Sequence, residues 1–203
     1  MYVFIAAVLW GAVFIHDAVL PQDAAGIRML SVPAGTFRMG SDWEHDSRNR
    51  FQGKGIFRFE SPLHTVKISA FSMSATEITR EQYKKVMGTD PSEYTNGEDL
   101  PVEMVSWHDA VRFCNTLSDM MGYSRCYMGD NGLCDVSVNG FRLPTEAEWE
   151  YACRAGKDSR YSSGEDAAEL GDVAWYSANS GERNLSAVRI DRAILKESRS
   201  GPH

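Results

Sequence analysis

Alternating apolar and polar positions predict short strands at the start of the chain. Residues 29–40 (MLSVPAGTFRMG) predict two strands joined by a turn at residues 33–35, a hairpin that ends at Gly40. Residues 41–61 are rich in charge and glycine and show no sustained period of two or 3.6. They predict a long, mobile surface loop.

A second region of alternation follows this loop. In residues 64–73, Val66 and Ile68 fall on one face and polar side chains on the other, which is typical of a strand with one solvated face. Much later in the chain, Phe141 and Leu143 predict a further short strand.

A capping box at the first turn predicts each of three helices. A side chain accepts a hydrogen bond from the backbone N–H three residues on, and the side chain there reaches back. The capping pairs are Thr79 with Gln82, Ser106 with Asp109, and Thr145 with Glu148, for helices over residues 80–87, 107–121 and 146–155. A glycine after each helix supplies a left-handed stop, at Gly88, Gly122 and Gly156.

Apolar residues at three- and four-residue steps give each helix a buried face. The expected faces are Tyr83, Val86 and Met87; then Trp107, Ala110, Val111, Cys114, Leu117 and Met121; and then Trp149, Ala152 and Cys153.

The segment between the second and third helices predicts a β-hairpin. Residues 126–134 (CYMGDNGLC) contain an Asn-Gly pair, which is a strong short-range hairpin signal. Cys126 and Cys134 are candidates for a disulfide across its base. Zinc ligation is the weaker alternative, because their separation is unlike the spacing of two to four residues in zinc knuckles.

Composition and charge narrow the function classes. The chain has 203 residues, a net charge of −7 and a pI near 5.2. Its basic residues are scattered among more numerous acids, so a nucleic-acid-binding surface is not expected. No i, i+4 pair of histidines and no nucleophile motif supports hydrolase chemistry.

The N-terminal segment resembles a signal peptide. Residues 2–15 carry no charge and are too few to cross a bilayer, so residues 1–26 are interpreted as a leader and the protein as exported. Anchoring to a membrane by an uncleaved leader, a buried N-terminal strand or helix of the fold, and a misassigned start are the alternatives. In an oxidising compartment, the four cysteines could pair in three ways.

Residues 140–156 (GFRLPTEAEWEYACRAG) resemble the signature of the formylglycine-generating enzyme family, the sulfatase-modifying factors. Other landmarks of this family stand in the same order along residues 29–181. They are residues 32–41 (VPAGTFRMGS), 60–64 (ESPLH), 76–79 (TEIT), 100–107 (LPVEMVSW), 110–114 (AVRFC) and 174–181 (AWYSANSG). The resemblance implies a C-type-lectin-like α+β fold, irregular, with short antiparallel strands and about three helices.

The resemblance also implies a chemistry. Members of the family use copper and dioxygen to oxidise a sulfatase cysteine to formylglycine, and two cysteine thiolates late in the chain hold the metal. Those thiolates follow Asn-Val-Trp-Glu-Trp and Arg-Gly-Gly-Ser-Trp segments, which this sequence lacks. We therefore expect an incomplete family domain over residues 27–181, truncated on its C-terminal side, and a divergent tail over residues 182–203, for which a frame shift is our interpretation.

Further site residues follow from the same resemblance. Asn179 and Ser180 resemble the start of a structural calcium site, with a plain turn as the alternative. Cysteines at the positions of Cys114 and Cys153 pair in the family with partners in the later part of the chain. From their own pattern, Cys114 and Cys153 are either small buried apolar residues or halves of a disulfide.

Acidic side chains give two more candidate sites, each with a simpler interpretation. Glu146, Glu148 and Glu150 do not converge on a helix, so capping and surface charge account for them better than acid–base catalysis does. Four residues of the charged loop could bind a cation, although a solvated acidic loop is the preferred interpretation: Asp42, Glu44, His45 and Asp46.

Two functions are therefore expected. The first is membership of the formylglycine-generating enzyme family, with a protein or peptide substrate such as a sulfatase and without the catalytic cysteine pair in this chain. The second is a non-catalytic, lectin-like binding module on the same scaffold. Copper and calcium are implied for complete family members, and no cofactor is assigned to this chain.

Overall fold

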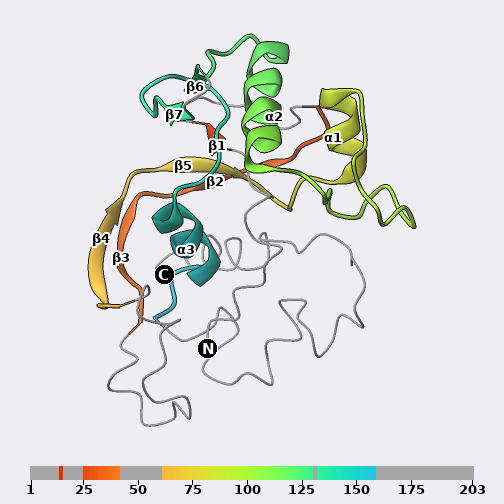
Figure 1. The fold of residues 1–203 in the computed structure, drawn as a ribbon. Helices are drawn as coiled ribbons and strands as arrows, with labels where there is room; N and C mark the ends of the chain where they lie inside the picture. Colours follow the sequence, from red (N-terminus) through yellow and green to blue (C-terminus); the bar gives the residue numbers. More distant parts are fainter. Residues whose placement is uncertain (1–13, 16–24, 42–60, 130–131, 159–203) are drawn as a thin grey trace, which may run out of the picture.

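The computed structural model describes residues 14–15, 25–41, 61–129 and 132–158 (Figure 1). Short antiparallel strands and three helices alternate along this part of the chain, which confirms the expected α+β class. The elements are β1 (Phe14–Ile15), β2 (Met29–Val32), β3 (Gly35–Met39), β4 (His64–Ile68), β5 (Phe71–Ser74), α1 (Arg80–Met87), α2 (Trp107–Met120), β6 (Tyr127–Met128), β7 (Leu133–Cys134) and α3 (Glu146–Arg154).

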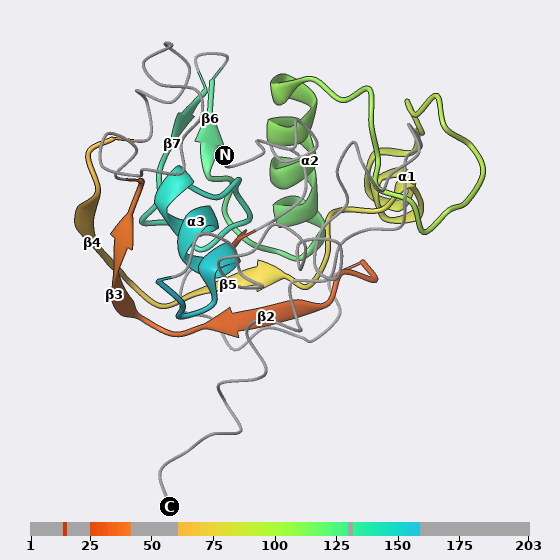
Figure 2. The same ribbon diagram turned by 90° about the horizontal axis from the view of Figure 1, so that it is seen from below.

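A long, bent antiparallel ribbon forms the base of the fold (Figures 1 and 2). β2 pairs with β5 and β3 pairs with β4, and one register runs through both pairs, from Met29 opposite Ser74 to Met39 opposite His64. The predicted hairpin over residues 29–40 is therefore wrong. The chain bends after Val32 without reversing, because β4 and β5 offer backbone partners along its whole length.

A third strand joins the ribbon from the segment expected to be a leader. β1 pairs with β5 on the side away from β2, with Phe14 opposite Met73. This pairing agrees with the alternative of an N-terminal strand. Residues 1–13 and 16–24 of the expected leader, residues 42–60 of the expected loop and residues 182–203 of the expected tail lie outside the described residues.

All three predicted capping boxes are present. In α3, the Thr145 backbone N–H donates to Glu148 Oε2 at 2.9 Å, and the Glu148 N–H donates to Thr145 Oγ1 at 3.2 Å. α1 ends at Gly88 as expected, but the left-handed residue that caps α3 is Ala155, one residue before Gly156. The stop therefore begins one residue earlier than the glycine position predicts.

Replacing Thr145 by alanine is expected to lower the free energy of unfolding by about 1 kcal/mol, because the first turn of α3 loses its cap. Urea denaturation followed by circular dichroism measures this change. Ser69→Ala, at an exposed residue outside the helices, is the control. An unchanged midpoint for Thr145→Ala would contradict a stabilising role for the cap.

Two clusters of buried side chains hold these elements together. The larger cluster lies between α1, α2 and the segments around β6, and the smaller one lies between the ribbon and α3. Tyr83 of α1 stacks on Phe113 of α2 with ring centres 5.4 Å apart. The sequence pattern missed Phe113, because it selected a narrower face of α2.

Two buried-face assignments and one strand prediction need correction. Trp107 is 42% exposed, since it stands in the first turn of α2, beyond the end of the core. Cys153 is exposed, whereas its neighbour Ala152 is buried. Phe141 is fully buried, yet no strand forms there, because its backbone N–H donates to Ser118 Oγ of α2 at 2.8 Å. Among the described residues, no helix has the length and apolar character to cross a membrane.

Candidate functional site

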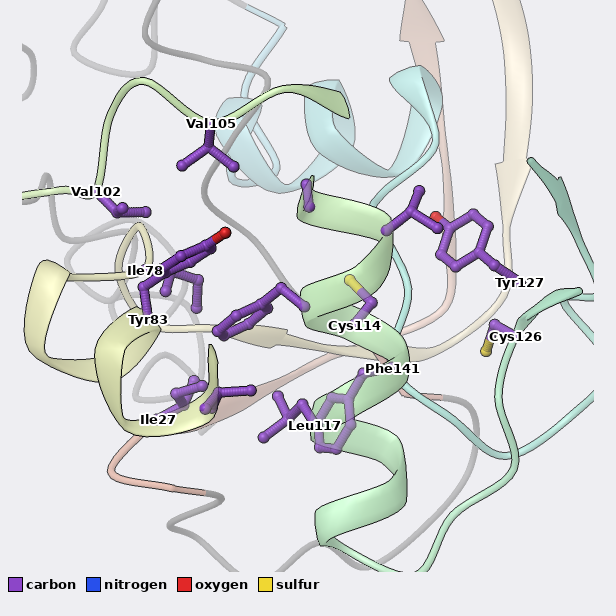
Figure 3. Close-up of a cluster of buried hydrophobic side chains, with 14 residues drawn as sticks. Ile27, Ile78, Tyr83, Val102, Val105, Cys114, Leu117, Cys126, Tyr127 and Phe141 are labelled. Atoms are coloured by element: carbon purple, nitrogen blue, oxygen red, sulfur yellow. The ribbon is translucent and has the colours of Figure 1, made fainter. Parts of the chain in front are cut away.

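The sequence-predicted cysteines gather where α2 faces the β6–β7 hairpin. Cys114 lies on the buried face of α2, and Cys126 and Tyr127 lie on the neighbouring segment (Figure 3). Cys134 stands opposite Tyr127 in the antiparallel pair. The hairpin was predicted from its turn residues, and this prediction is confirmed.

The environment of these thiols favours their protonated form. Cys114 and Cys126 are fully buried, and Cys134 is half-buried. Burial, reinforced by the neighbouring cysteine, raises the pKa of Cys126 to about 11. Burial also raises the pKa of Cys114 and of Cys134, although the charge of Arg142 opposes the shift. All three groups are therefore thiols at neutral pH.

Cys126 and Cys134 are free thiols in this structure, and Cys134 lies close enough to contribute to the raised pKa of Cys126. Their disulfide stays a prediction. Cys114 is buried, which agrees with the small apolar residue expected at its position. Cys153 is exposed on α3, so it does not agree with the small buried apolar residue expected at its position.

Tyr127 is held by hydrogen bonds on both sides. Its hydroxyl accepts a hydrogen bond from the backbone N–H of Leu143 at 3.0 Å. Its backbone carbonyl accepts one from the Asn115 side chain at 2.8 Å, and its backbone N–H donates to the same amide. Burial raises the pKa of Tyr127. This tyrosine fixes the hairpin against α2 and against the segment that leads into α3.

A buried ion pair closes this region. Arg142 binds Glu148 in a bidentate manner, with N–O distances of 2.8 and 2.6 Å, and the two side chains are 10% and 13% exposed. Burial pushes the pKa of Glu148 up, but the hydrogen bonds from Arg142 and Thr145 more than offset it, so the pKa is lowered. Glu148 is thus both a helix cap and the partner of a buried charge, and sequence reasoning found only the cap.

Glu150 also has a structural role. It accepts hydrogen bonds from the backbone N–H of Gly40 at 3.0 Å and from Arg154 at 2.6 Å, and Arg154 in turn donates to the Gly40 carbonyl. The i, i+4 spacing of Glu150 and Arg154 was a signal for this pair. Nothing in the sequence predicted the contact of Glu150 with Gly40, the residue that follows β3.

Apolar side chains are exposed beside this region. Met128 and Leu133 of the hairpin are 64% and 69% exposed. The Trp107 ring lies edge-on to Tyr127, with centres 6.1 Å apart. It also lies so close to Gly132 that a β-carbon there would come within 2.2 Å of it. We call Trp107, Met128 and Leu133 the apolar surface.

Other predicted site residues do not meet here. Asn179 and Ser180, the calcium candidates, lie outside the described residues, as do the four candidates of the charged loop. Within the described ranges, no group of three or more His, Cys, Asp or Glu side chains has the arrangement of a metal site.

Several known proteins are similar to this chain over part of their length. The chain is 35% identical over 138 residues to the chaperone protein LppX of Paenibacillus barcinonensis, which covers 60% of this chain and 49% of that protein. It is 28% identical over 169 residues to the formylglycine-generating enzyme of Mus musculus, covering 69% and 43%. The match to the Mycobacterium tuberculosis enzyme is 26% identical over 175 residues, covering 68% and 54%. The chain spans about half the length of these curated relatives.

Solved structures agree with the fold. Treponema denticola variable protein 1 matches with a TM-score of 0.64 and 30% identity, covering 77% of this chain and 63% of that one. CarF matches with a TM-score of 0.52 and 23% identity, covering 75% and 69%, which supports the fold alone.

The family comparison covers most of the chain. The sulfatase-modifying factor enzyme 1-like domain matches residues 17–199, a range that reaches into both the expected leader and the expected tail. The earlier resemblance rested on motifs within residues 29–181, including the signature that surrounds Arg142 and Glu148. The chain therefore belongs to the formylglycine-generating enzyme family of sulfatase-modifying factors.

Proposed function

We propose that this chain is a scaffold of the family that binds a protein or peptide partner and does not by itself oxidise a cysteine. The observation that carries the proposal is the state of the clustered cysteines. Cys114, Cys126 and Cys134 are buried or half-buried, and each has a raised pKa. A thiol with a raised pKa is the reverse of the low-pKa thiolate that reactive cysteines use.

Copper, which the family implies, fits the described cysteines poorly. Thiolate ligands suit Cu(I), and binding at neutral pH must remove the thiol protons. In the cluster this removal works against the burial that raises each pKa. Cys153 is exposed on α3, an element that packs on the ribbon and not on this cluster. We therefore derive no reaction step through copper for this part of the chain.

The apolar surface supports the binding part of the proposal. Trp107, Met128 and Leu133 are exposed on or beside a hairpin that Tyr127 fixes in place. Large exposed apolar side chains are a common feature of protein-binding sites. The family acts on sulfatases, and the relative at 35% identity is named a chaperone, so a polypeptide is the partner class that we propose.

The proposal also keeps two expectations from the sequence. We propose an exported protein, because the uncharged run over residues 2–15 has the length of a signal-peptide hydrophobic region. Calcium ligation by Asn179 and Ser180 remains a proposal that follows from the resemblance.

A sulfatase-type peptide tests the binding part of this proposal. We expect saturable binding of a fluorescein-labelled Cys-x-Pro-x-Arg peptide, measured by anisotropy. Trp107→Ala should weaken it about tenfold, which corresponds to about 1.4 kcal/mol. The matched control is Met120→Ala, an exposed methionine at the other end of α2.

Either of two results would contradict the proposal. Absence of saturable binding would remove the peptide-binding function. Equal weakening by Trp107→Ala and Met120→Ala would show that the apolar surface is not where the peptide binds.

A further inference from the structure

The two cysteines of the β6–β7 hairpin are placed for reaction with each other. Tyr127 pairs with Cys134, and the Asp135 backbone N–H donates to the Cys126 carbonyl at 2.8 Å, so Cys126 lies directly beside the base of the hairpin. The Cys134 thiol lies close enough to Cys126 to contribute to the raised pKa of Cys126. Cys126 is fully buried and Cys134 is half-buried.

We propose that Cys126 and Cys134 are a redox-active pair that closes to a disulfide and reopens, with a small-molecule disulfide of the glutathione class as oxidant. This inference goes beyond the proposed function and does not depend on it. Closing the pair joins two residues that the hairpin already places near each other at its base, so the hairpin need not be rebuilt to form the bond.

Exposure decides the order of the two steps. Half-buried Cys134, after its thiol loses a proton, attacks one sulfur of the small disulfide, which forms a mixed disulfide and releases one thiol. Because burial raises the pKa of Cys134, this step is slow at neutral pH and becomes faster as the pH rises. Cys126 then attacks the Cys134 sulfur, which forms the internal bond and releases the second thiol. The two cysteines lose two protons and two electrons, and the oxidant gains them as its two thiols.

The other two cysteines are less suited to this reaction. Cys114 is fully buried on α2 and has no exposed surface through which a small disulfide could approach it. Cys153 is exposed on α3, which packs in a different cluster. Only Cys126 and Cys134, among the described cysteines, share one hairpin.

The closed form should also hold the turn more firmly. Gly129 and Gly132 adopt left-handed backbone angles of 66° and 70°, and Trp107 packs against Gly132. A bond at the base of the hairpin limits how far the two strands can separate. Oxidation therefore stiffens the hairpin segment of the apolar surface.

The sequence allows a direct readout of the pairing. Trypsin cuts after Arg125 and after Arg142, so one peptide, residues 126–142, holds both cysteines. Cys114 falls in residues 113–125, and Cys153 falls in residues 143–154. The purified chain is equilibrated in buffers of reduced and oxidised glutathione, quenched in acid, alkylated and digested.

In oxidising buffer, we expect peptide 126–142 to lose two hydrogen masses and to take up no alkylating agent. In reducing buffer, it should take up two equivalents. Hydrogen exchange of the Asp135 amide should be at least about tenfold slower in the oxidised form. Cys153→Ser should leave all of this unchanged, whereas Cys134→Ser should abolish both the mass change and the slower exchange.

Three outcomes would overturn the proposal. The first is double alkylation of peptide 126–142 at every glutathione ratio. The second is a linkage of this peptide to residues 113–125 in place of the internal bond. The third is a disulfide that reducing glutathione fails to reopen. Cys134→Ser changes a half-buried residue, so the test does not depend on removing the buried Cys126.

Discussion

Replacing Phe141 by alanine is expected to lower the free energy of unfolding by about 3 to 5 kcal/mol. Phe141 is fully buried in the larger cluster, with its ring 5.8 Å from that of Tyr123. Its backbone N–H is fixed by Ser118, so the segment cannot easily move to fill the space that the ring leaves. The lost transfer energy and the remaining cavity therefore add.

Urea denaturation of Phe141→Ala and Phe141→Leu measures this effect. We expect the leucine variant to lose less, because it fills part of the cavity. Leu133→Ala, at a residue that is 69% exposed, is the control and should change stability by less than about 0.5 kcal/mol. Equal effects of Phe141→Ala and Leu133→Ala would contradict the position of this core.

Replacing Glu148 by glutamine is expected to cost about 3 kcal/mol, because it leaves Arg142 as a buried charge without its carboxylate partner. The capping function is retained, since Gln82 fills the same position in the capping box of α1. The loss thus reports the ion pair and not the cap. Urea denaturation at neutral pH measures it.

The matched control is Asp109→Asn in the capping box of α2. Its partner Arg112 is 67% exposed, so the pair is solvated and its loss should cost about 0.5 kcal/mol. If both variants lose the same stability, the buried pair of Arg142 and Glu148 stabilises the fold no more than the solvated pair does, and the prediction is wrong.

This ion pair also gives a dependence on pH with a defined sign. The pKa of Glu148 lies below its ordinary value of 4.5, so the folded state binds this proton less readily than the unfolded state. The stabilisation is present above the ordinary pKa and is lost as pH falls through the lowered one. The difference between the parent and Glu148→Gln should therefore shrink on acidification.

The parts of the fold predicted correctly from the sequence depend on local signals. A cap such as Thr145 with Glu148, or a stop such as Gly88, involves residues only a few positions apart. The hairpin at residues 126–134 is local in the same way. These elements could be predicted because short-range backbone chemistry determines them.

The parts predicted wrongly depend on contacts that are distant in the sequence. Residues 29–32 pair with β5, some 40 positions away, so the local turn signal gave the wrong partner. Phe141 is buried without a strand because Ser118 of α2 binds its backbone. The position of Cys153 on the exposed side of α3 follows from how that helix packs on the ribbon.

The candidate site was predictable only in pieces. The hairpin signal predicted that Cys126 and Cys134 lie close together. Nothing in the sequence indicated that Cys114 of α2 packs in the same cluster. The pairing of Arg142 with Glu148 spans a turn between them and has no regular spacing to reveal it. The apolar surface around Trp107 was hidden, because the helical pattern assigned this residue to the core.

The most direct test of the central claim is the mass of a sulfatase-type Cys-x-Pro-x-Arg peptide after incubation with the purified chain, Cu(I) and air. We predict an unchanged peptide mass, because the clustered thiols Cys114, Cys126 and Cys134 are buried or half-buried and protonated at neutral pH. The mass loss that accompanies conversion of cysteine to an aldehyde, if abolished by Cys114→Ser or Cys153→Ser, would show that the chain is itself an oxidase and would contradict the proposal.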